Sequence, residues 1–326
     1  MFEITIWIFL FIGSYVLIYF AADIFLDNLK DICVIYKLSP FIIGLLVLGI
    51  DPEESIASII AAANGLPYIA VGNVIGNSIL SLSLSFALPA FFHRIQIKSI
   101  SHFYFLIIYS CLILILFGFF VRIGLLIFGV LTLIVYGLYV LKSLYSISKK
   151  GSIDIIEINR LMEELVTDQE KLIKGTKLRK IILVCVGLGF IILGGELLII
   201  SAEILINLTG LAEEFFGFII IAFVTNVEEL TLIFKSIKKK SVEIGLGGMI
   251  GKVIWNLSFT YGISGIIAIS IDFRLILIFN WLVLLSLIIY YHGRTKDEWL
   301  GMMDAIVLSA FLIIFITINL IPLKPI

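Results

Sequence analysis

Five acidic side chains lie near the middle of long apolar stretches of this chain: Asp51, Glu53, Glu54, Glu228 and Glu229. On the membrane-insertion scale each ionised carboxylate costs ~2.5–3.5 kcal/mol, so five of them cost about 12–18 kcal/mol. That sum equals or exceeds the ~5–15 kcal/mol that stabilises a typical folded protein. These carboxylates must therefore be protonated, paired with cations or in contact with water, and each arrangement predicts an ion or proton site.

The spacing of the first three acids narrows their geometry. Asp51 and Glu54 are three residues apart, so on a helix they share a face. Glu53 and Glu54 point about 100° apart, so one enters a central site and the other faces a neighbouring helix. Pro52 predicts a kink or break near residues 49–50, and a break frees backbone carbonyls, which are good ligands for hard cations.

A second wall of polar side chains follows in two glycine-containing stretches. Asn73, Asn77 and Ser81 recur every fourth residue, and Asn256 lies in the later stretch. Each side chain alone is typical of a hydrogen bond between helices, and glycines four apart are typical of close helix packing. Together with the acids, the oxygen atoms favour cation coordination.

Lys252 is the one basic residue in the middle of an apolar stretch. It requires a carboxylate partner, which could be Glu53, Glu228 or another acid. Two interpretations stay open. The lysine could form a structural salt bridge, or its tethered charge could take the place of a monovalent cation.

Composition indicates the solvent in which these residues sit. The 326 residues are 61% hydrophobic and only 14% charged, against about 25% charged in an average soluble domain. This excludes a disordered chain, a basic nucleic-acid binder and an ordinary soluble enzyme. Neither the three cysteines nor the three histidines have a metal-binding spacing.

Ten apolar stretches are long enough to cross the ~30 Å hydrocarbon layer, which takes about 20 residues each. They cover 4–24, 39–63, 67–92, 101–120, 123–146, 180–206, 215–237, 242–271, 274–292 and 299–321. With ten spans both termini lie on one side, and 19 of the 23 Lys and Arg residues fall on the other. The positive-inside rule then places both termini outside and the central linker in the cytoplasm, in an integral protein of the cell membrane.

The chain divides into two similar halves, a first five-helix repeat over 1–146 and a second over 180–326, joined by the polar linker 147–179. Glu54, Gly72 and Gly76 recur as Glu229, Gly247 and Gly251, at a constant offset of 175 residues. Because five spans separate the copies, they insert with opposite orientation. We therefore predict an all-α polytopic membrane protein of ten transmembrane helices in two inverted five-helix repeats, with an ion site at the midplane.

These motifs resemble the cation/calcium exchanger superfamily, and the sodium/calcium exchangers in particular. That family has ten spans, and its two repeats carry Gly-Thr-Ser-Leu-Pro-Glu followed by Gly-Asn-x-x-Gly-Ser-Asn. In this chain the first copy reads GIDPEE at 49–54 and GNVIGNS at 72–78, and the second reads VTNVEE at 224–229 and GGMIGKV at 247–253. The resemblance covers nearly the whole chain in topology, and the motifs match in part.

The resemblance implies that Glu54 and Glu229 coordinate the divalent cation and that Thr225 lies beside it. Asp51 and Asn226 stand where the family has serines, and Asn77 and Lys252 replace two serines linked to sodium binding. This implies a retained divalent site with altered sodium sites. The expected ligands are Glu54, Glu229, Asp51, Thr225, Asn226, Asn73, Asn77, Ser81 and Asn256, and the expected coupling or charge-compensating residues are Glu53, Glu228 and Lys252.

The leading hypothesis is a secondary-active cation antiporter that moves a divalent cation, with Ca²⁺ the expected substrate, against Na⁺ or H⁺. A proton-coupled or sodium-independent exchanger of the same fold is the alternative, and a cation channel is the alternative from another class. We expect no enzyme activity and no cofactor. The expected partners are the lipid bilayer and inorganic cations, not nucleic acid, and a monomer is compatible with this arrangement.

Overall fold

The computed structural model describes residues 2–35, 51–92, 94–96, 102–150, 177–226, 242–294 and 299–320, and nearly all of them are helical. The first half contains α1 (Phe2–Ile35), α3 (Pro52–Ala63), α4 (Pro67–Phe92), α5 (His102–Gly118) and α6 (Gly124–Lys150). The second half contains α8 (Lys177–Thr209), α9 (Glu213–Phe215), η2 (Phe216–Ile221), α10 (Ala222–Thr225), α12 (Val242–Trp255), η3 (Asn256–Thr260), α13 (Tyr261–Ala268), α14 (Leu275–Arg294) and α15 (Met302–Leu320).

Six of the described helices are long and apolar enough to cross a membrane: α1, α4, α6, α8, α14 and α15. The shorter apolar helix α5 lies in a seventh predicted span. The other three predicted spans, 39–63, 215–237 and 242–271, contain α3, η2 with α10, and α12 to α13. A mostly helical membrane fold is therefore confirmed, and the count of ten spans stays a prediction.

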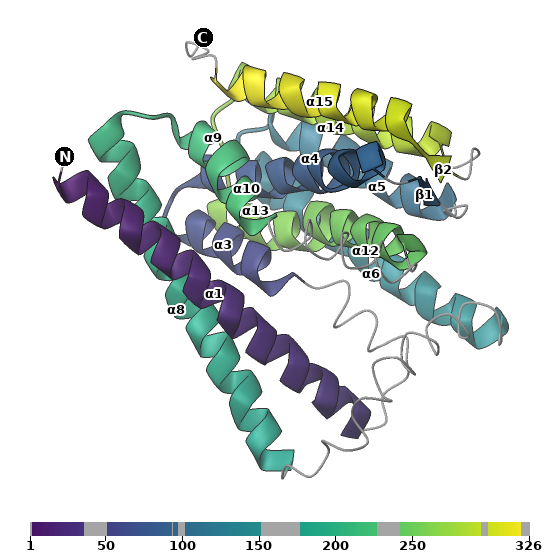
Figure 1. The fold of residues 1–326 in the computed structure, drawn as a ribbon, viewed down its shortest axis with the longest axis horizontal. Helices are drawn as coiled ribbons and strands as arrows, with labels where there is room; N and C mark the ends of the chain where they lie inside the picture. Colours follow the sequence, from purple (N-terminus) through teal and green to yellow (C-terminus); the bar gives the residue numbers. More distant parts are fainter. Residues whose placement is uncertain are drawn as a thin grey trace.

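Helices α1 and α8 form a pair that stands apart from the rest of the bundle (Figure 1). Glycines of α8 allow the two backbones to approach closely. A Cβ atom at Gly187 would lie 2.9 Å from the backbone nitrogen of Phe25, and one at Gly194 would lie 3.2 Å from the carbonyl oxygen of Ser14. Their outer faces expose large apolar side chains such as Phe9, as expected for contact with lipid.

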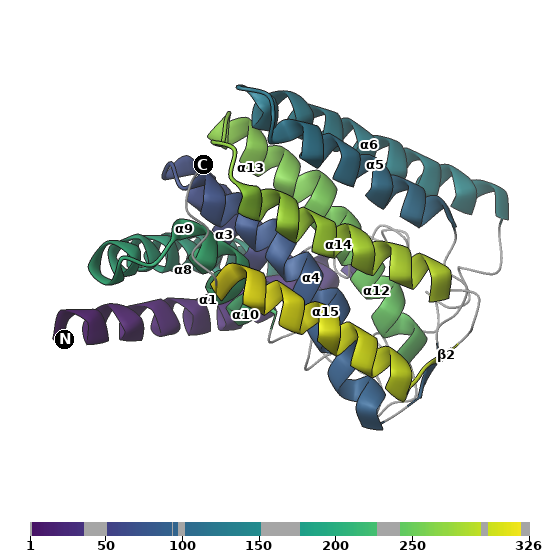
Figure 2. The same ribbon diagram turned by 90° about the horizontal axis from the view of Figure 1, so that it is seen from above.

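Helices α3, α13, α14 and α15 pack against α4, and α5 and α6 lie at the opposite edge of the molecule from α1 (Figure 2). In an apolar 18-residue stretch of α4, 83% of the residues are buried, whereas in the corresponding stretch of α1 only 22% are. Helix α4 is therefore a central helix. An apolar core that includes Phe86, Phe105 and Leu284 joins α4, α5 and α14. A second apolar cluster, which includes Ile18, Ala61 and Leu198, joins α1, α3 and α8.

One short pair of strands accompanies the helices. Strands β1 (Ile95–Gln96) and β2 (Trp299–Leu300) are antiparallel and pair Ile95 with Leu300. The sequence does not predict them, because a two-residue strand is too short to show an alternation of apolar and polar residues. They join the segment that follows α4 to the segment that precedes α15.

Two helices of the second half contain π-helical turns. The segment η2 leads into α10, and η3 continues α12 into α13. Such turns are rare, and they often lie at functional sites because they redirect side chains and loosen the regular backbone ladder. Both turns border the polar residues described below.

The predicted linker, 147–179, and the predicted break at residues 49–50 lie mainly or wholly outside the described residues. The described chain resumes with Asp51 in an extended conformation, and α3 begins at Pro52. Proline is well tolerated at the first helical position, since that residue has no intrahelical amide bond to lose. A helix start immediately after Asp51 agrees with the expected effect of Pro52.

Candidate functional site

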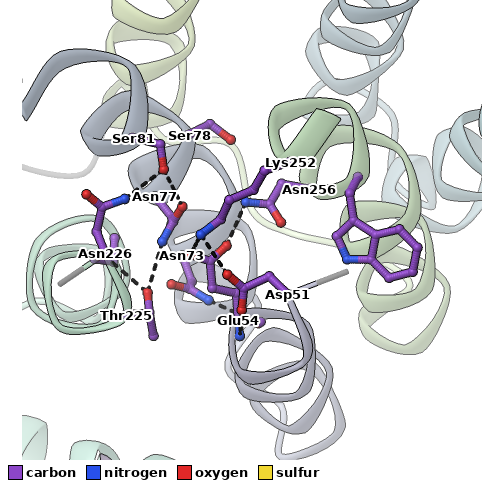
Figure 3. A network of polar contacts seen from close by, with 12 residues as sticks. Asp51, Glu54, Asn73, Asn77, Ser78, Ser81, Thr225, Asn226, Lys252 and Asn256 are labelled. Carbon is purple, nitrogen blue, oxygen red and sulfur yellow. Dashed lines mark hydrogen bonds and ion pairs between the residues drawn. The ribbon is translucent and has the colours of Figure 1, made fainter. Parts of the chain in front are cut away.

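The start of α3 brings two carboxylates to one lysine. Asp51 caps α3, and its Oδ1 accepts a hydrogen bond of 3.2 Å from the backbone N–H of Glu54. Lys252 reaches across from α12, with its Nζ 2.6 Å from Asp51 Oδ2 and 2.7 Å from Glu54 Oε1 (Figure 3). Asp51 and Glu54 therefore face the same ammonium, although Asp51 is the cap of α3 and not a residue within the helix as predicted, and Lys252 has carboxylate partners.

Two asparagines flank the Glu54 side chain from different helices. Asn256, at the start of η3, donates a hydrogen bond of 2.8 Å from Nδ2 to Glu54 Oε2. Asn73, on α4, donates to the Glu54 carbonyl oxygen at 3.2 Å and to Ser58 Oγ at 2.9 Å. Both asparagines are buried, and in the described part of the chain neither side-chain carbonyl oxygen has a hydrogen-bond partner.

A second group of polar side chains lies against the first and joins α4 to α10. Asn77 Nδ2 donates to Thr225 Oγ1 at 3.1 Å, and its Oδ1 accepts from Ser81 Oγ at 3.0 Å. Asn226 Nδ2 donates to Ser81 Oγ at 2.7 Å, and its Oδ1 accepts from Ser85 Oγ at 3.1 Å. The two halves of the chain thus share one buried hydrogen-bonded network (Figure 3).

Close backbone packing sets the separation of α4 from η2. A Cβ atom at Gly72 would lie 2.9 Å from the backbone nitrogen of Phe218. A Cβ atom at Gly76 would overlap the carbonyl oxygen of the same residue. The four-residue glycine spacing therefore allows helix contact in this half, as predicted, and it places Asn73 and Asn77 beside the start of α3 and the end of α10.

Five residues that form hydrogen bonds in the site were absent from the sequence-based prediction. Ser55 Oγ lies 2.8 Å from Thr260 Oγ1 and accepts from Trp255 Nε1 at 2.8 Å, which ties α3 to α12 and η3. Ser58 and Ser85 bond to Asn73 and Asn226. Helical spacing could have indicated these two serines, since each lies four residues after a predicted ligand.

The predicted residues divide by their position. One set converges around the Glu54 side chain and consists of Asp51, Glu54, Asn73, Asn256 and Lys252. A second set adjoins the first and consists of Asn77, Ser81, Thr225 and Asn226. Glu53 is buried and lies beside Glu54 in the first turn of α3. Glu228 and Glu229 lie outside the described residues.

The oxygen atoms of this arrangement are of the types that a hard cation accepts. The arrangement combines two carboxylates with amide and hydroxyl oxygens, which are the ligand types that calcium accepts. Burial would make the two negative charges costly without a compensating positive charge, and Lys252 supplies one. In the described residues no group of three or more His, Cys, Asp and Glu side chains is placed to hold a metal, so a cation here would depend on amide oxygens as well.

Comparison with known proteins agrees with this picture. The family model for sodium/calcium exchanger proteins matches residues 6–145 and 179–321. An uncharacterized membrane protein of Methanocaldococcus jannaschii is 26% identical over 307 residues, which cover 90% of this chain and 92% of that protein.

Solved structures of the sodium-calcium exchanger NCX_Mj share the fold. The form soaked with 2.5 mM Na⁺ and 10 mM Sr²⁺ superposes with a TM-score of 0.58 at 20% identity, over 96% of this chain and 99% of that one. The form soaked with no Na⁺ and no Ca²⁺ gives a TM-score of 0.56 at 21% identity, over 95% and 99%. Because the family model matches most of the chain, the resemblance seen in the sequence is confirmed: this membrane protein belongs to the sodium/calcium exchanger family.

Proposed function

We propose that this protein is a secondary-active antiporter that exchanges a divalent cation, with Ca²⁺ the first candidate, for Na⁺ or H⁺. The cation is bound by Glu54 and Asp51 together with the side-chain oxygens of Asn73 and Asn256. Glu229, the repeat partner of Glu54, completes the ligand set. Membership of the exchanger family supports the reaction class, and the geometry around Glu54 supports the position of the site.

The observation that carries this proposal is a pair of buried amide oxygens that have no hydrogen-bond partner among the described residues. Nearly all buried polar atoms in proteins form hydrogen bonds, so Asn73 Oδ1 and Asn256 Oδ1 require an explanation. Both asparagines use their Nδ2 groups on Glu54, one on its carbonyl oxygen and one on its carboxylate. A cation beside Glu54 would give both oxygens a partner.

Exchange follows from competition for the same oxygens. Because a divalent cation and its counter-ions need the same carboxylates, both cannot bind there at once. Alternating access then requires one part of the molecule to move past the rest. The α1–α8 pair is the candidate moving part, since it packs closely on itself and contacts α3 through Gly195, where a Cβ atom would lie 2.8 Å from Ile60 Cδ1.

The direct test is counterflow of radioactive Ca²⁺ in proteoliposomes that contain the purified full chain. Uptake is measured under an imposed outward Na⁺ gradient, then under a proton gradient, with other divalent cations as competitors. We expect saturable, gradient-driven uptake. Flux that neither saturates nor responds to a counter-ion on the opposite side would contradict antiport and favour a channel.

Two matched variants test the site in the same assay. Glu54→Gln should lower Ca²⁺ uptake at least about 100-fold, because an amide removes the charge that attracts the cation and leaves Asp51 as the remaining carboxylate at Lys252. Glu203→Gln, on the exposed face of α8, should transport like the wild type. Normal uptake by Glu54→Gln would refute the assignment of Glu54 as a cation ligand.

A further inference from the structure

Lys252 occupies the same carboxylate oxygens that the proposed cation would need. Its ammonium lies within 2.7 Å of oxygens on both Asp51 and Glu54, and its side chain is only 9% exposed. Asn256, four residues later in the same continuous helical segment, holds the second Glu54 oxygen. One face of α12 and η3 therefore holds both oxygens of this carboxylate.

The equivalent position in the first half is neutral. Asn77 precedes Lys252 by the 175-residue repeat offset, and its amide bonds to Thr225 and Ser81 instead of a carboxylate. The ammonium is thus a feature of one half only. It is directed at the acidic side chains, whereas Asn77 belongs to the adjoining neutral hydrogen-bonded group.

Without a bound cation, each of two buried carboxylates would lack an opposite charge. The free-energy cost of these unpaired charges would hinder the conformational change of the empty protein. An antiporter usually solves this by returning with monovalent cations in the site. Here a lysine attached to the protein already provides a positive charge at bonding distance from both carboxylates. A divalent cation must displace this ammonium to bind, and the ammonium can return when the cation leaves.

We propose that Lys252 is a built-in counter-cation that takes the place of a sodium ion in the transport cycle. The inference rests on the proposed function and deepens it, because it assigns Na⁺ no required role at this position. Release of the divalent cation then does not depend on Na⁺ on the receiving side. Removal of the ammonium should create such a dependence.

The test compares wild type and Lys252→Met in proteoliposomes loaded with radioactive Ca²⁺. Release is measured at one fixed pH into a choline medium and into a Na⁺ medium, with thiocyanate as the permeant counter-anion. The readout is the ratio of the release rate in Na⁺ to the rate in choline. For wild type we expect a ratio within about twofold of one, and for Lys252→Met a ratio of about ten or more, since its carboxylates need an external cation.

Two further variants separate charge from structure. Lys252→Arg keeps the positive charge and should keep the wild-type ratio even if the larger group slows transport. Lys180→Met removes an ammonium from another ion pair, in which Lys180 Nζ lies 2.5 Å from Asp31 Oδ2, and should also keep the wild-type ratio. If Lys252→Met does not fold, the ratios of the wild type and of Lys252→Arg still decide the question.

A wild-type ratio of about ten or more, or equal ratios in wild type and Lys252→Met, would overturn the role of Lys252. Exchange of Ca²⁺ for Ca²⁺, measured in the same vesicles, distinguishes this failure from failure of the proposed function. If wild type exchanges Ca²⁺ for Ca²⁺ but depends on Na⁺, only the lysine proposal fails. If wild type exchanges no Ca²⁺ under any condition, the proposed function fails with it.

Discussion

The helix α4 and the segment formed by α12 and η3 carry corresponding positions of the sequence repeat, yet they contribute to the site in different ways. On α4, Asn77 and Ser81 bond to neutral groups, and Gly76 is pressed against the backbone of η2. The corresponding Lys252 and Asn256 both hold the Glu54 carboxylate.

The backbones of the two regions differ as well. Among the described residues, a Cβ atom at Gly251, the partner of Gly76, would meet nothing within 4 Å, and a π-helical turn begins at Asn256. No such turn occurs among the described residues of α4. The first half thus supplies a neutral wall packed closely against η2, and the second supplies the charged group beside a π-helical turn. Two similar segments of one sequence can therefore take different roles, one in helix packing and the other in charge compensation.

The largest expected difference between the two regions concerns stability. Gly76→Ala should lower the free energy of unfolding by about 1–3 kcal/mol. The added methyl group would overlap the carbonyl oxygen of Phe218, which is part of the backbone and cannot change rotamer as a side chain can. Gly251→Ala should lower the free energy of unfolding less than Gly76→Ala does, because a Cβ atom at Gly251 meets no described residue within 4 Å and alanine is the better helix former. Melting temperatures in detergent measure both. Equal losses in the two variants would mean that the packing of the two regions does not differ.

An intermediate effect is expected on the affinity for the transported cation. Asn256→Ala removes both a donor to Glu54 and a candidate ligand oxygen, so the KM for Ca²⁺ should rise about tenfold. Ser81→Ala removes a hydroxyl from the neutral wall and should change the KM by about twofold or less. Initial rates of Ca²⁺ uptake over a range of concentrations measure these values. A larger effect of Ser81→Ala would reverse the assignment of roles.

The smallest expected effect concerns the start of α4. Glu213, in the turn between α8 and η2, accepts hydrogen bonds from the backbone N–H groups of Tyr68 at 2.9 Å and Ile69 at 3.3 Å. Burial raises the pKa of Glu213 to about 7, with a further contribution from neighbouring Glu214. Because the folded protein holds the proton more tightly than the unfolded chain, this group destabilises the fold as pH rises from about 4.5 through about 7.

Glu213→Gln removes that penalty and retains an oxygen that can accept both hydrogen bonds. The variant should therefore melt higher than wild type at pH 8, and the difference should shrink at pH 5. Thermal melting of both proteins across this pH range provides the measurement. A difference that grows towards pH 5 would show that the ionised form of Glu213 stabilises α4 more than its burial costs.

Local spacing was enough to predict that Asp51 and Glu54 lie together and that Lys252 meets a carboxylate. Asp51 and Glu54 face one ammonium because Asp51 caps the first turn of α3, which contains Glu54. Lys252 needed a carboxylate because an isolated buried ammonium is too costly. The glycine pair at Gly72 and Gly76 indicated close helix packing, and the family motifs indicated the fold. Each of these inferences depends on a short stretch of sequence or on a cost that holds in any protein.

The rest depended on contacts between distant parts of the chain. The sequence did not identify Asp51 and Glu54 as the particular partners of Lys252, since Glu53 and Glu228 fitted equally well. The hydrogen bond from Trp255 to Ser55 joins residues 200 positions apart, and no local pattern encodes it. The contact of Gly76 with the Phe218 carbonyl was hidden for the same reason, since it joins residues far apart in the sequence.

The most direct test of the central claim is an experimental structure of the full chain with Sr²⁺, whose scattering reveals its position. We predict a Sr²⁺ ion bound to the Glu54 carboxylate and to the side-chain oxygens of Asn73 and Asn256, with the Lys252 ammonium displaced. Sr²⁺ bound elsewhere, or an unchanged ion pair between Lys252 and Glu54 in a protein that carries the ion, would contradict it.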